Sequence, residues 1–392
     1  MTYNIRPAHR IDDIKEYYFS RKLREVARLN AEGKDIISLG IGGPDMPPAP
    51  EVIEALTLGA SRADAHSYQI HIGLPSLREA YARWYRKYYG VILNPETEIR
   101  PLIGSKEGIL HISLAFLNPG DGVLVPNPGY PTYTSVSKIV GAKIFTYDLE
   151  ETNGWQPRIE QLEQLPLGQI KLMWLNYPHM PTGAPAQRKT LESIIDFCRR
   201  HGIVVAHDNP YSFILNDNPE SILSIDGARD IAIELNSLSK SHNMAGWRMA
   251  MVASNPQFIE WILKIKSNID SGQFKPVMEA AVEALNQDED WYKNLNCNYR
   301  SRRQIAEQIM HTIGCSFDSS QQGLFLWGKV PENYTDGESL ADHLLYDAGV
   351  FVTPGSVFGT NGKKYIRISL CATEAKLNEA LSRIKKLITN RI

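Results

Sequence analysis

The feature that most constrains this fold is an alternation of short apolar runs with longer amphipathic segments, from about residue 48 to about residue 290. The short runs are rich in Val, Ile and Leu, whereas the longer segments repeat their apolar residues at intervals of three and four. Repeated units of this kind form a mostly parallel sheet that is covered by helices on both faces. The expected strands, all apolar on both faces, are 122–125, 142–147, 171–175, 203–206, 231–235 and 247–253.

The pattern changes after residue 290, which indicates a second structural unit. The expected helices before that point include 76–89, 106–117, 186–201 and 275–286. A long helix at 291–312 follows, and then a strand at 323–330, a helix near 340–348, two short strands and a closing helix at 375–388. For a chain of 392 residues, we predict an α/β fold with a large domain at 48–290 and a smaller α+β domain at 1–47 and 291–392, including an N-terminal arm.

Charge and composition exclude several classes of partner. The 42 Lys and Arg residues nearly balance 44 Asp and Glu residues, so no overall field would attract nucleic acid or an anionic membrane. No apolar run reaches the roughly 20 residues that cross a bilayer, and the opening MTYNIRPAHR lacks a signal core, so we expect a cytoplasmic protein. The four cysteines form no CxxC pair and the histidines show no HExxH spacing, so we expect no metal site.

Chemically active residues gather at the expected strand ends, where open parallel sheets bind ligands. Asp208 and Tyr211 follow one strand, Lys240 and Arg248 follow the next, and GSKEG at 104–108 opens a helix whose N–H groups attract an anion. Each residue alone has an ordinary structural role, such as a solvated lysine or a helix start. Together they predict pyridoxal phosphate, which needs an amine for its aldehyde, a carboxylate for its ring nitrogen, a donor for its phenolic oxygen and an anion cradle.

Six stretches, in order along nearly the whole chain, resemble the fold-type I, class I/II pyridoxal phosphate-dependent aminotransferases. The most specific is SLSKSHNMAGWRMA at 237–250, which resembles the cofactor-lysine motif of that family. The others are LGIGGPD at 39–45, YQIHIGLPSLREA at 68–80, NPGYPTY at 127–133, HDNPY at 207–211 and YIRISL at 365–370. The resemblance implies an aspartate aminotransferase-like fold and a ping-pong transfer of the amino group from an L-amino acid to a 2-oxo acid.

The resemblance also implies a role for each matching residue. Lys240 would be the Schiff-base lysine and proton carrier, Asp208 would pair with the ring nitrogen, and Tyr211 would donate to the phenolic oxygen. Arg367 would bind the substrate α-carboxylate, a task that suits its planar guanidinium. The further binding residues would be Tyr130 on the ring face, Gly104, Ser105, Lys106, Ser237 and Arg248 at the phosphate, Asn176 and Gly42 beside the substrate, and Tyr68 reaching the partner's phosphate in a homodimer with shared sites.

One departure from the family lies at Met180, where relatives usually carry the asparagine of Asn-Pro-Thr-Gly. Methionine cannot donate a hydrogen bond to the cofactor's phenolic oxygen. The stretch 267–274 contains no arginine that could hold a distal carboxylate, which argues against a dicarboxylate preference of that kind. SNIDSGQF, GSKEG and FVTPGSVFG are instead similar to the LL-diaminopimelate aminotransferases.

Several alternatives stay open on sequence alone. The activity could be LL-diaminopimelate aminotransfer specifically, or a C–S lyase or another reaction that labilises the same Cα proton. A ligand-sensing regulator is disfavoured because the family resemblance begins at Leu39, which leaves little chain for a DNA-binding module. A nicotinamide dehydrogenase is disfavoured because no GxGxxG follows a strand. His207 either tunes Asp208 by hydrogen bonding or simply packs.

Overall fold

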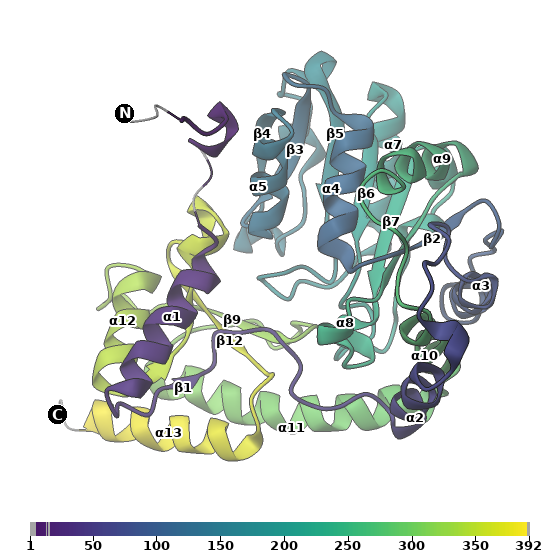
Figure 1. Ribbon diagram of the computed structural model, residues 1–392. Helices are drawn as coiled ribbons and strands as arrows, with labels where there is room; N and C mark the ends of the chain where they lie inside the picture. Colours follow the sequence, from purple (N-terminus) through teal and green to yellow (C-terminus); the bar gives the residue numbers. More distant parts are fainter. Residues whose placement is uncertain (1–4, 13, 15, 390–392) are drawn as a thin grey trace.

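A seven-stranded sheet forms the centre of the molecule, with strand order β2-β8-β7-β6-β5-β3-β4 (Figure 1). The computed structural model describes residues 5–12, 14 and 16–389; the remaining residues of the predicted small domain lie outside it. The strands are β2 (Ile99–Leu102), β3 (Gly122–Asn127), β4 (Lys143–Asp148), β5 (Ile170–Leu175), β6 (Val204–Asp208), β7 (Ala232–Ser237) and β8 (Ala250–Ala253). β3 to β7 pair in parallel, whereas β8 is antiparallel to both β7 and β2. The predicted mostly parallel α/β sheet is thus confirmed.

Three details of the strand predictions were wrong. β2 was not predicted, although its four residues are all buried. The strand predicted at 247–253 begins only at Ala250, because Arg248 has a left-handed backbone with φ of 57° that interrupts the extended conformation. β4 was predicted to be buried on both faces, but Lys143 and Asp148 at its two ends are exposed because β4 is an edge strand.

Alternate residues of the central strands enter two different cores, as expected for a sheet with two covered faces. Leu172 and Trp174 of β5 point into a core that also contains residues of α4, α5 and α9. Met173 and Leu175 point to the other face, where residues of α3 and α7 pack. The helices are α2 (Pro50–Ala60), α3 (Pro75–Tyr89), α4 (Ser105–Phe116), α5 (Pro131–Ile139), α6 (Ile159–Leu162), α7 (Arg188–His201), α8 (Leu238–Ser241), α9 (Pro256–Lys266) and α10 (Lys275–Leu285).

The C-terminal part of the chain forms a smaller α+β region below the main sheet in the view of Figure 1. Its three-stranded antiparallel sheet has the order β11-β12-β9. The elements are β9 (Phe325–Lys329), β10 (Val350–Phe351), β11 (Thr353–Pro354), β12 (Tyr365–Ser369), α11 (Glu289–Ile313), α12 (Gly337–Asp347) and α13 (Glu374–Thr389). The helices agree with the predicted ones to within three residues. Side chains cap two of them at the N-terminus: Asp288 accepts from the backbone of α11, and Asp336 and Ser339 form a capping box on α12.

The N-terminal segment packs on this smaller region. α1 (Tyr18–Ala31) shares an apolar cluster with Leu345 and Phe351, and β1 (Ile37–Ser38) pairs in parallel with β10. After residue 340 the chain therefore packs against its own N-terminal segment, as the predicted small domain requires. The boundaries at 47/48 and 290/291 stay predictions.

Candidate active site

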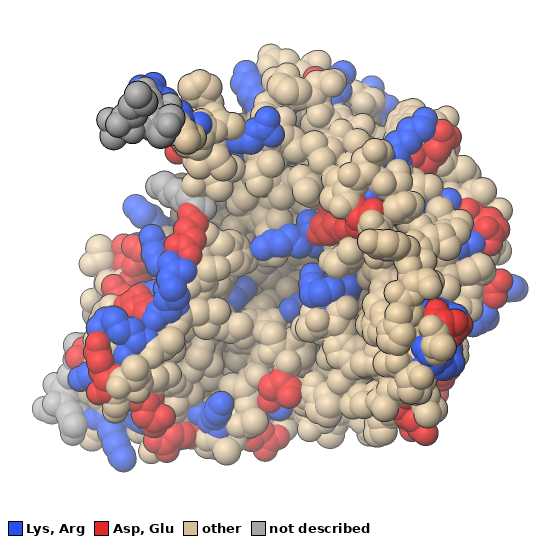
Figure 2. All heavy atoms as spheres, viewed as in Figure 1, with Lys and Arg blue, Asp and Glu red and all other residues tan. Residues whose placement is uncertain are grey.

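A pocket of about 360 Å³ opens between the strand ends of the main sheet and the smaller region. Its lining comes from α1, α4, α5 and α8, from the ends of β5 to β7, and from β9 and β12. Figure 2 shows this face hollowed near its centre, with Lys and Arg side chains inside the hollow. Of the predicted site residues, those that line the pocket are Gly42, Ser105, Lys106, Tyr130, Asn176, Asp208, Tyr211, Ser237, Lys240, Arg248 and Arg367.

Lys240 lies on the single helical turn of α8, directly after β7. Ser237 caps this turn by accepting the N–H of Ser239, so the lysine is presented from a fixed backbone. Its Nζ donates to the carbonyl oxygen of Gly42 at 2.5 Å. Burial lowers the pKa of Lys240, which favours the neutral amine that a nucleophile or a base requires.

Asp208 ends β6 with its side chain buried. One carboxylate oxygen, Oδ2, accepts the hydroxyl of Tyr133 at 2.9 Å, whereas Oδ1 is buried and has no partner among the described residues. Burial raises the pKa of Asp208 to about 6, against the opposing effects of the Tyr133 hydrogen bond and of His207 and Lys240. Oδ1 of Asp208 is therefore free to pair with a cation. Such a partner would stabilise the ionised carboxylate and lower the pKa of Asp208.

The start of α4 forms an anion cradle beside Arg248. Gly104 has φ of 83°, and a Cβ built on it would lie 1.9 Å from Nη2 of Arg248, so only glycine lets the guanidinium approach. Ser105 Oγ is buried without a partner. The Lys106 ammonium lies over the ring of Tyr17, 4.3 Å from its centroid, and burial together with Arg248 lowers its pKa. The cradle therefore has free N–H groups and several positive charges.

Arg367 lies on β12, the central strand of the small sheet, and faces the pocket from the side opposite Asp208. Its guanidinium carbon lies 3.8 Å from the ring centroid of Phe325 and 4.6 Å from that of Phe358. Nη2 donates to Gly40 O at 2.9 Å, Nη1 lies 3.2 Å from the sulfur of Met180, and Nε is buried without a partner. Burial lowers the pKa of Arg367 to about 10, which leaves it cationic at neutral pH.

Asn176 and Tyr211 are two further predicted residues that line the pocket. The amide of Asn176 donates to Asp208 O at 2.6 Å, and its oxygen accepts the N–H of Met180 at 2.8 Å, so it links two pocket segments. Burial raises the pKa of Tyr211 well above its ordinary value, which keeps its hydroxyl protonated as a donor. Tyr68 and Gly104 are the two predicted residues that do not line the pocket: Gly104 directly precedes Ser105, whereas Tyr68 is 91% exposed.

The sequence interpretation missed one wall of the pocket. Tyr17, Phe19 and Leu23 reach it from the N-terminal segment, and Phe325 and Phe358 reach it from the small region. No motif marks these residues. Tyr133 was also missed, although it lies inside the quoted NPGYPTY; its position three residues after Tyr130 places both on one side of α5, where it stacks on Trp174 and reaches Asp208.

The groups without partners fit pyridoxal phosphate. The free Oδ1 of Asp208 suits a protonated ring nitrogen, the glycine-permitted cradle with Ser105 and Arg248 suits a phosphate, and the amine of Lys240 lies in the same pocket.

Elsewhere, Glu107, His111 and Asp270 bring possible metal-ligand atoms within 4.8 Å of one another. Lys266 already pairs with Asp270 at 2.6 Å, and Nε2 of His111 lies 3.1 Å from a carboxylate oxygen of Glu107.

Comparison with known proteins points to the same chemistry. The family model for aminotransferase class I and II matches residues 34–384. The LL-diaminopimelate aminotransferase of Dehalococcoides mccartyi is 41% identical over 378 residues, 96% of this chain and 97% of that protein. Its counterpart in Nitratidesulfovibrio vulgaris is 39% identical over 97% of this chain and 98% of its own length. Substrate-bound BacF of Bacillus subtilis superposes with a TM-score of 0.93 at 35% identity, covering 98% of both chains.

Proposed function

The chain belongs to the class I and II aminotransferases, which are pyridoxal 5'-phosphate-dependent transferases, and from this premise we propose that Lys240, Asp208 and Tyr211 are its catalytic residues. The observation that carries the proposal is the free, buried Oδ1 of Asp208 in the pocket that also contains the Lys240 amine. A carboxylate there holds a proton on the cofactor's ring nitrogen. Tyr211, kept protonated by burial, donates to the phenolic oxygen.

The remaining cofactor contacts follow from the cradle. Gly104, Ser105 and Lys106 offer backbone N–H groups at the start of α4, and Ser237 and Arg248 approach from the segment that follows β7. Tyr130, the N-cap residue of α5, lines the pocket and is our candidate for the ring face. These residues hold the cofactor through both its charged group and its aromatic face.

When bound, pyridoxal phosphate supplies an aldehyde that condenses with amines and a cationic ring that withdraws electrons from the substrate Cα. Lys240 would hold the cofactor through its Nζ and, as a neutral amine, would take the proton that the substrate Cα loses. Asp208 would keep a proton on the ring nitrogen. Phe19 and Phe325 exclude water from the reacting atoms.

Arg367 binds the substrate α-carboxylate, and Gly42 and Asn176 shape the same side of the pocket. The free Nε of Arg367 and the flanking phenylalanine rings support this assignment, because a desolvated guanidinium binds a carboxylate strongly. Asn176 uses one N–H for Asp208 O and its oxygen for the N–H of Met180, which leaves its second N–H for the carboxylate. We therefore propose that it fixes the pocket and also contacts the carboxylate.

LL-diaminopimelate is the first candidate amino donor, because the relatives that share about 40% identity over nearly the full chain carry that activity in their names. The test is a half-reaction survey, in which cofactor-loaded protein is mixed with single amino acids and the visible absorption of the cofactor is followed. We expect rapid loss of the visible band with LL-diaminopimelate and slower loss with aspartate. No response to any amino acid would contradict the proposed aminotransfer, whereas pyruvate and ammonia released without an oxo acid would favour a C–S lyase.

A homodimer with shared sites completes the proposal. Tyr68 is 91% exposed, and Ile70, Ile269 and Phe274 nearby are also exposed apolar residues. His66 stacks on Phe274, with ring centroids 6.1 Å apart, so the two stretches lie side by side. Such a patch suits a second copy of the chain, whose cradle Tyr68 would then reach.

Complementation between two inactive variants tests the shared site. Lys240→Ala and Tyr68→Ala each damage their own homodimer, but a mixed dimer contains one site with an intact Lys240 and an intact partner tyrosine. Random mixing should therefore restore about a quarter of the wild-type activity. No recovery after proven subunit exchange would show that Tyr68 serves its own chain or none.

Among the described residues, no helix is long and apolar enough to cross a membrane. A cytoplasmic location stays a prediction.

A further inference from the structure

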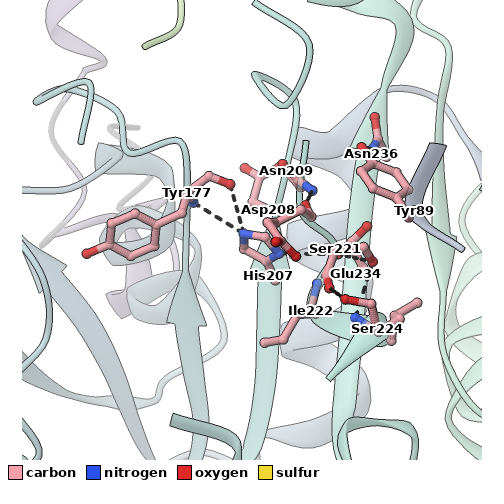
Figure 3. Close-up of polar contacts among 12 residues, drawn as sticks. Tyr89, Tyr177, His207, Asp208, Asn209, Ser221, Ile222, Ser224, Glu234 and Asn236 are labelled. Atoms are coloured by element: carbon pink, nitrogen blue, oxygen red, sulfur yellow. Dashed lines mark hydrogen bonds and ion pairs between the residues drawn. The ribbon is translucent and has the colours of Figure 1, made fainter. Parts of the chain in front are cut away.

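A buried acid–imidazole pair lies beneath the candidate site, on β6, which ends at Asp208, and on β7, which directly precedes the helical turn with Lys240 (Figure 3). Glu234 lies within β7, and His207 lies on β6 directly before Asp208. Both side chains have 0% exposure, and Nδ1 of His207 is 3.2 Å from Oε2 of Glu234. Neither residue lines the pocket, so the proposed chemistry leaves the pair without a role.

The hydrogen bonds of Glu234 favour an ionised carboxylate. Oε1 accepts the hydroxyl of Tyr85 at 2.7 Å, and Oε2 accepts both the hydroxyl of Ser221 and the N–H of Ile222 at 2.9 Å. An ionised carboxylate can only accept, so the imidazole nitrogen that faces it carries a proton. His207 is thereby fixed with its hydrogen on Nδ1.

The other ring nitrogen of His207 faces the segment that follows β5. Nε2 accepts the backbone N–H of Tyr177 at 3.2 Å and lies 3.0 Å from the carbonyl oxygen of the same residue (Figure 3). With the proton on Nδ1, the lone pair of Nε2 is free to accept that N–H. The histidine predicted to tune Asp208 or simply to pack instead bonds to neither of its carboxylate oxygens and anchors a backbone turn.

That turn carries residues of the pocket. Asn176, directly before Tyr177, donates to Asp208 O at 2.6 Å and accepts the N–H of Met180 at 2.8 Å. The sulfur of Met180 in turn lies 3.2 Å from Nη1 of Arg367. A shift of the turn therefore moves the groups beside both the cofactor acid and the substrate guanidinium.

We propose that Glu234 and His207 are positioning residues: Glu234 keeps the proton of His207 on Nδ1, so that Nε2 accepts the N–H of Tyr177 and fixes the turn that carries Asn176 and Met180. The functional part of this inference rests on the proposed roles of Asp208 and Arg367. The tautomer of His207 that the inference requires does not rest on those roles, because His207 and Glu234 contact each other in the protein without any bound group.

The tautomer is tested first, by nitrogen NMR of cofactor-free protein labelled at histidine, with His207→Gln identifying the signals. We expect a protonated Nδ1 and an unprotonated Nε2 in the wild type. Glu234→Met should reverse the two, because it removes the acceptor of the Nδ1 proton, whereas a proton on Nε2 can be donated to the carbonyl oxygen of Tyr177, 3.0 Å away. A wild-type His207 protonated at Nε2, whether alone or together with Nδ1, overturns the proposal whatever the enzyme does.

Two half-replacements of the imidazole test the function. His207→Asn keeps a donor near the Nδ1 position for Glu234 but loses the contact with Tyr177, whereas His207→Gln places an acceptor near the Nε2 position and leaves Glu234 with one donor fewer. We expect kcat/KM to fall about tenfold in His207→Asn and about threefold in His207→Gln, as for one lost hydrogen bond. The stability of the cofactor-free protein should follow the opposite order, with His207→Asn the more stable.

If His207 only packed, kcat/KM and the free energy of unfolding would rank His207→Asn and His207→Gln in the same order. That result overturns the proposal. Tyr85→Phe is the matched control, because it removes a different donor from Glu234 and leaves His207 in place. It should lower stability with kcat/KM within about twofold of wild type. If either imidazole variant does not fold, the wild-type tautomer and Glu234→Met still decide. Wild-type protein inactive towards every amino acid would contradict the proposed function and leave the tautomer result standing.

Discussion

The two walls of the pocket differ in chemistry and in origin. The cofactor wall consists of Ser105, Asp208, Ser237, Lys240 and Arg248, whereas the substrate wall consists of Phe19, Phe325, Phe358 and Arg367. The first wall contains several charged groups and buried oxygens without partners, at Asp208 and Ser105. The second surrounds a single guanidinium with aromatic rings. A rigid, charged ligand suits the first wall, and the second suits a carboxylate that must leave water.

This difference leads to separable effects of substitution. Changes in the cofactor wall should weaken retention of pyridoxal phosphate, whereas changes in the substrate wall should raise KM for amino acids and leave the cofactor spectrum intact. A substitution in the cofactor wall that only raised KM, or one in the substrate wall that only weakened cofactor retention, would contradict this difference. The five predictions that follow run from the largest expected effect to the smallest.

Asp208→Asn should have the largest effect. A carboxylate about 4 Å from a cationic ring nitrogen contributes roughly 4 kcal/mol at an effective dielectric near 20, which corresponds to about a thousandfold in kcat. The measurement is single-turnover kinetics of the loaded variant with the best amino donor. Retention of more than a tenth of the wild-type rate would contradict the role of Asp208.

The same substitution should stabilise the cofactor-free protein. Burial raises the pKa of Asp208 from 3.8 to about 6, so the folded state binds its proton more tightly and loses stability as pH rises from about 4 to about 6. At pH 7 the penalty has its full size, at most about 3 kcal/mol, and Asp208→Asn removes it. Urea unfolding without cofactor should show the variant to be more stable at pH 7 and equal to wild type below pH 4.

Arg367→Lys should lower kcat/KM about a hundredfold, mainly through KM. Lysine keeps the charge but loses the planar fork and the stacking on Phe325, which together are worth about 2–3 kcal/mol. Arg248→Lys is the matched change in the other wall and should weaken cofactor binding instead. Similar profiles for the two variants would remove the distinction between the walls.

Gly104→Ala should weaken cofactor binding about tenfold, because the added methyl group displaces the guanidinium of Arg248 from the cradle. Gly120 provides the control, since it also has a positive φ, of 90°, but has no atom within 4 Å of its would-be Cβ. Gly120→Ala should therefore cost stability and leave the cofactor dissociation constant unchanged. Equal dissociation constants for Gly104→Ala and wild type would contradict the cradle.

Met180→Asn should have the smallest effect, and it tests the position where the two walls meet. The new amide donor can reach the phenolic oxygen of the cofactor and stabilise its anionic form, so the pH midpoint of the visible absorption band should fall by about one unit. Met180→Leu adds no donor and should leave the midpoint in place. Identical midpoints in all three proteins would show that position 180 does not reach that oxygen.

The predictability of the site follows the same division. The cofactor wall could be predicted because Asp208 and Lys240 lie in continuous motifs that directly follow strands. The substrate wall could not, apart from Arg367, because Phe19 and Phe325 are ordinary apolar residues, and only the return of the chain brings them together. For the same reason β2, an edge strand paired antiparallel with the distant β8, had no local signal.

The account depends most directly on a covalent bond between pyridoxal phosphate and Lys240. Borohydride reduction of the loaded protein, followed by peptide mass spectrometry, should place a stable phosphopyridoxyl group on Lys240 alone, and Lys240→Arg should carry none. A reduced adduct on Lys106, or none on any lysine of a protein saturated with the cofactor, would contradict it.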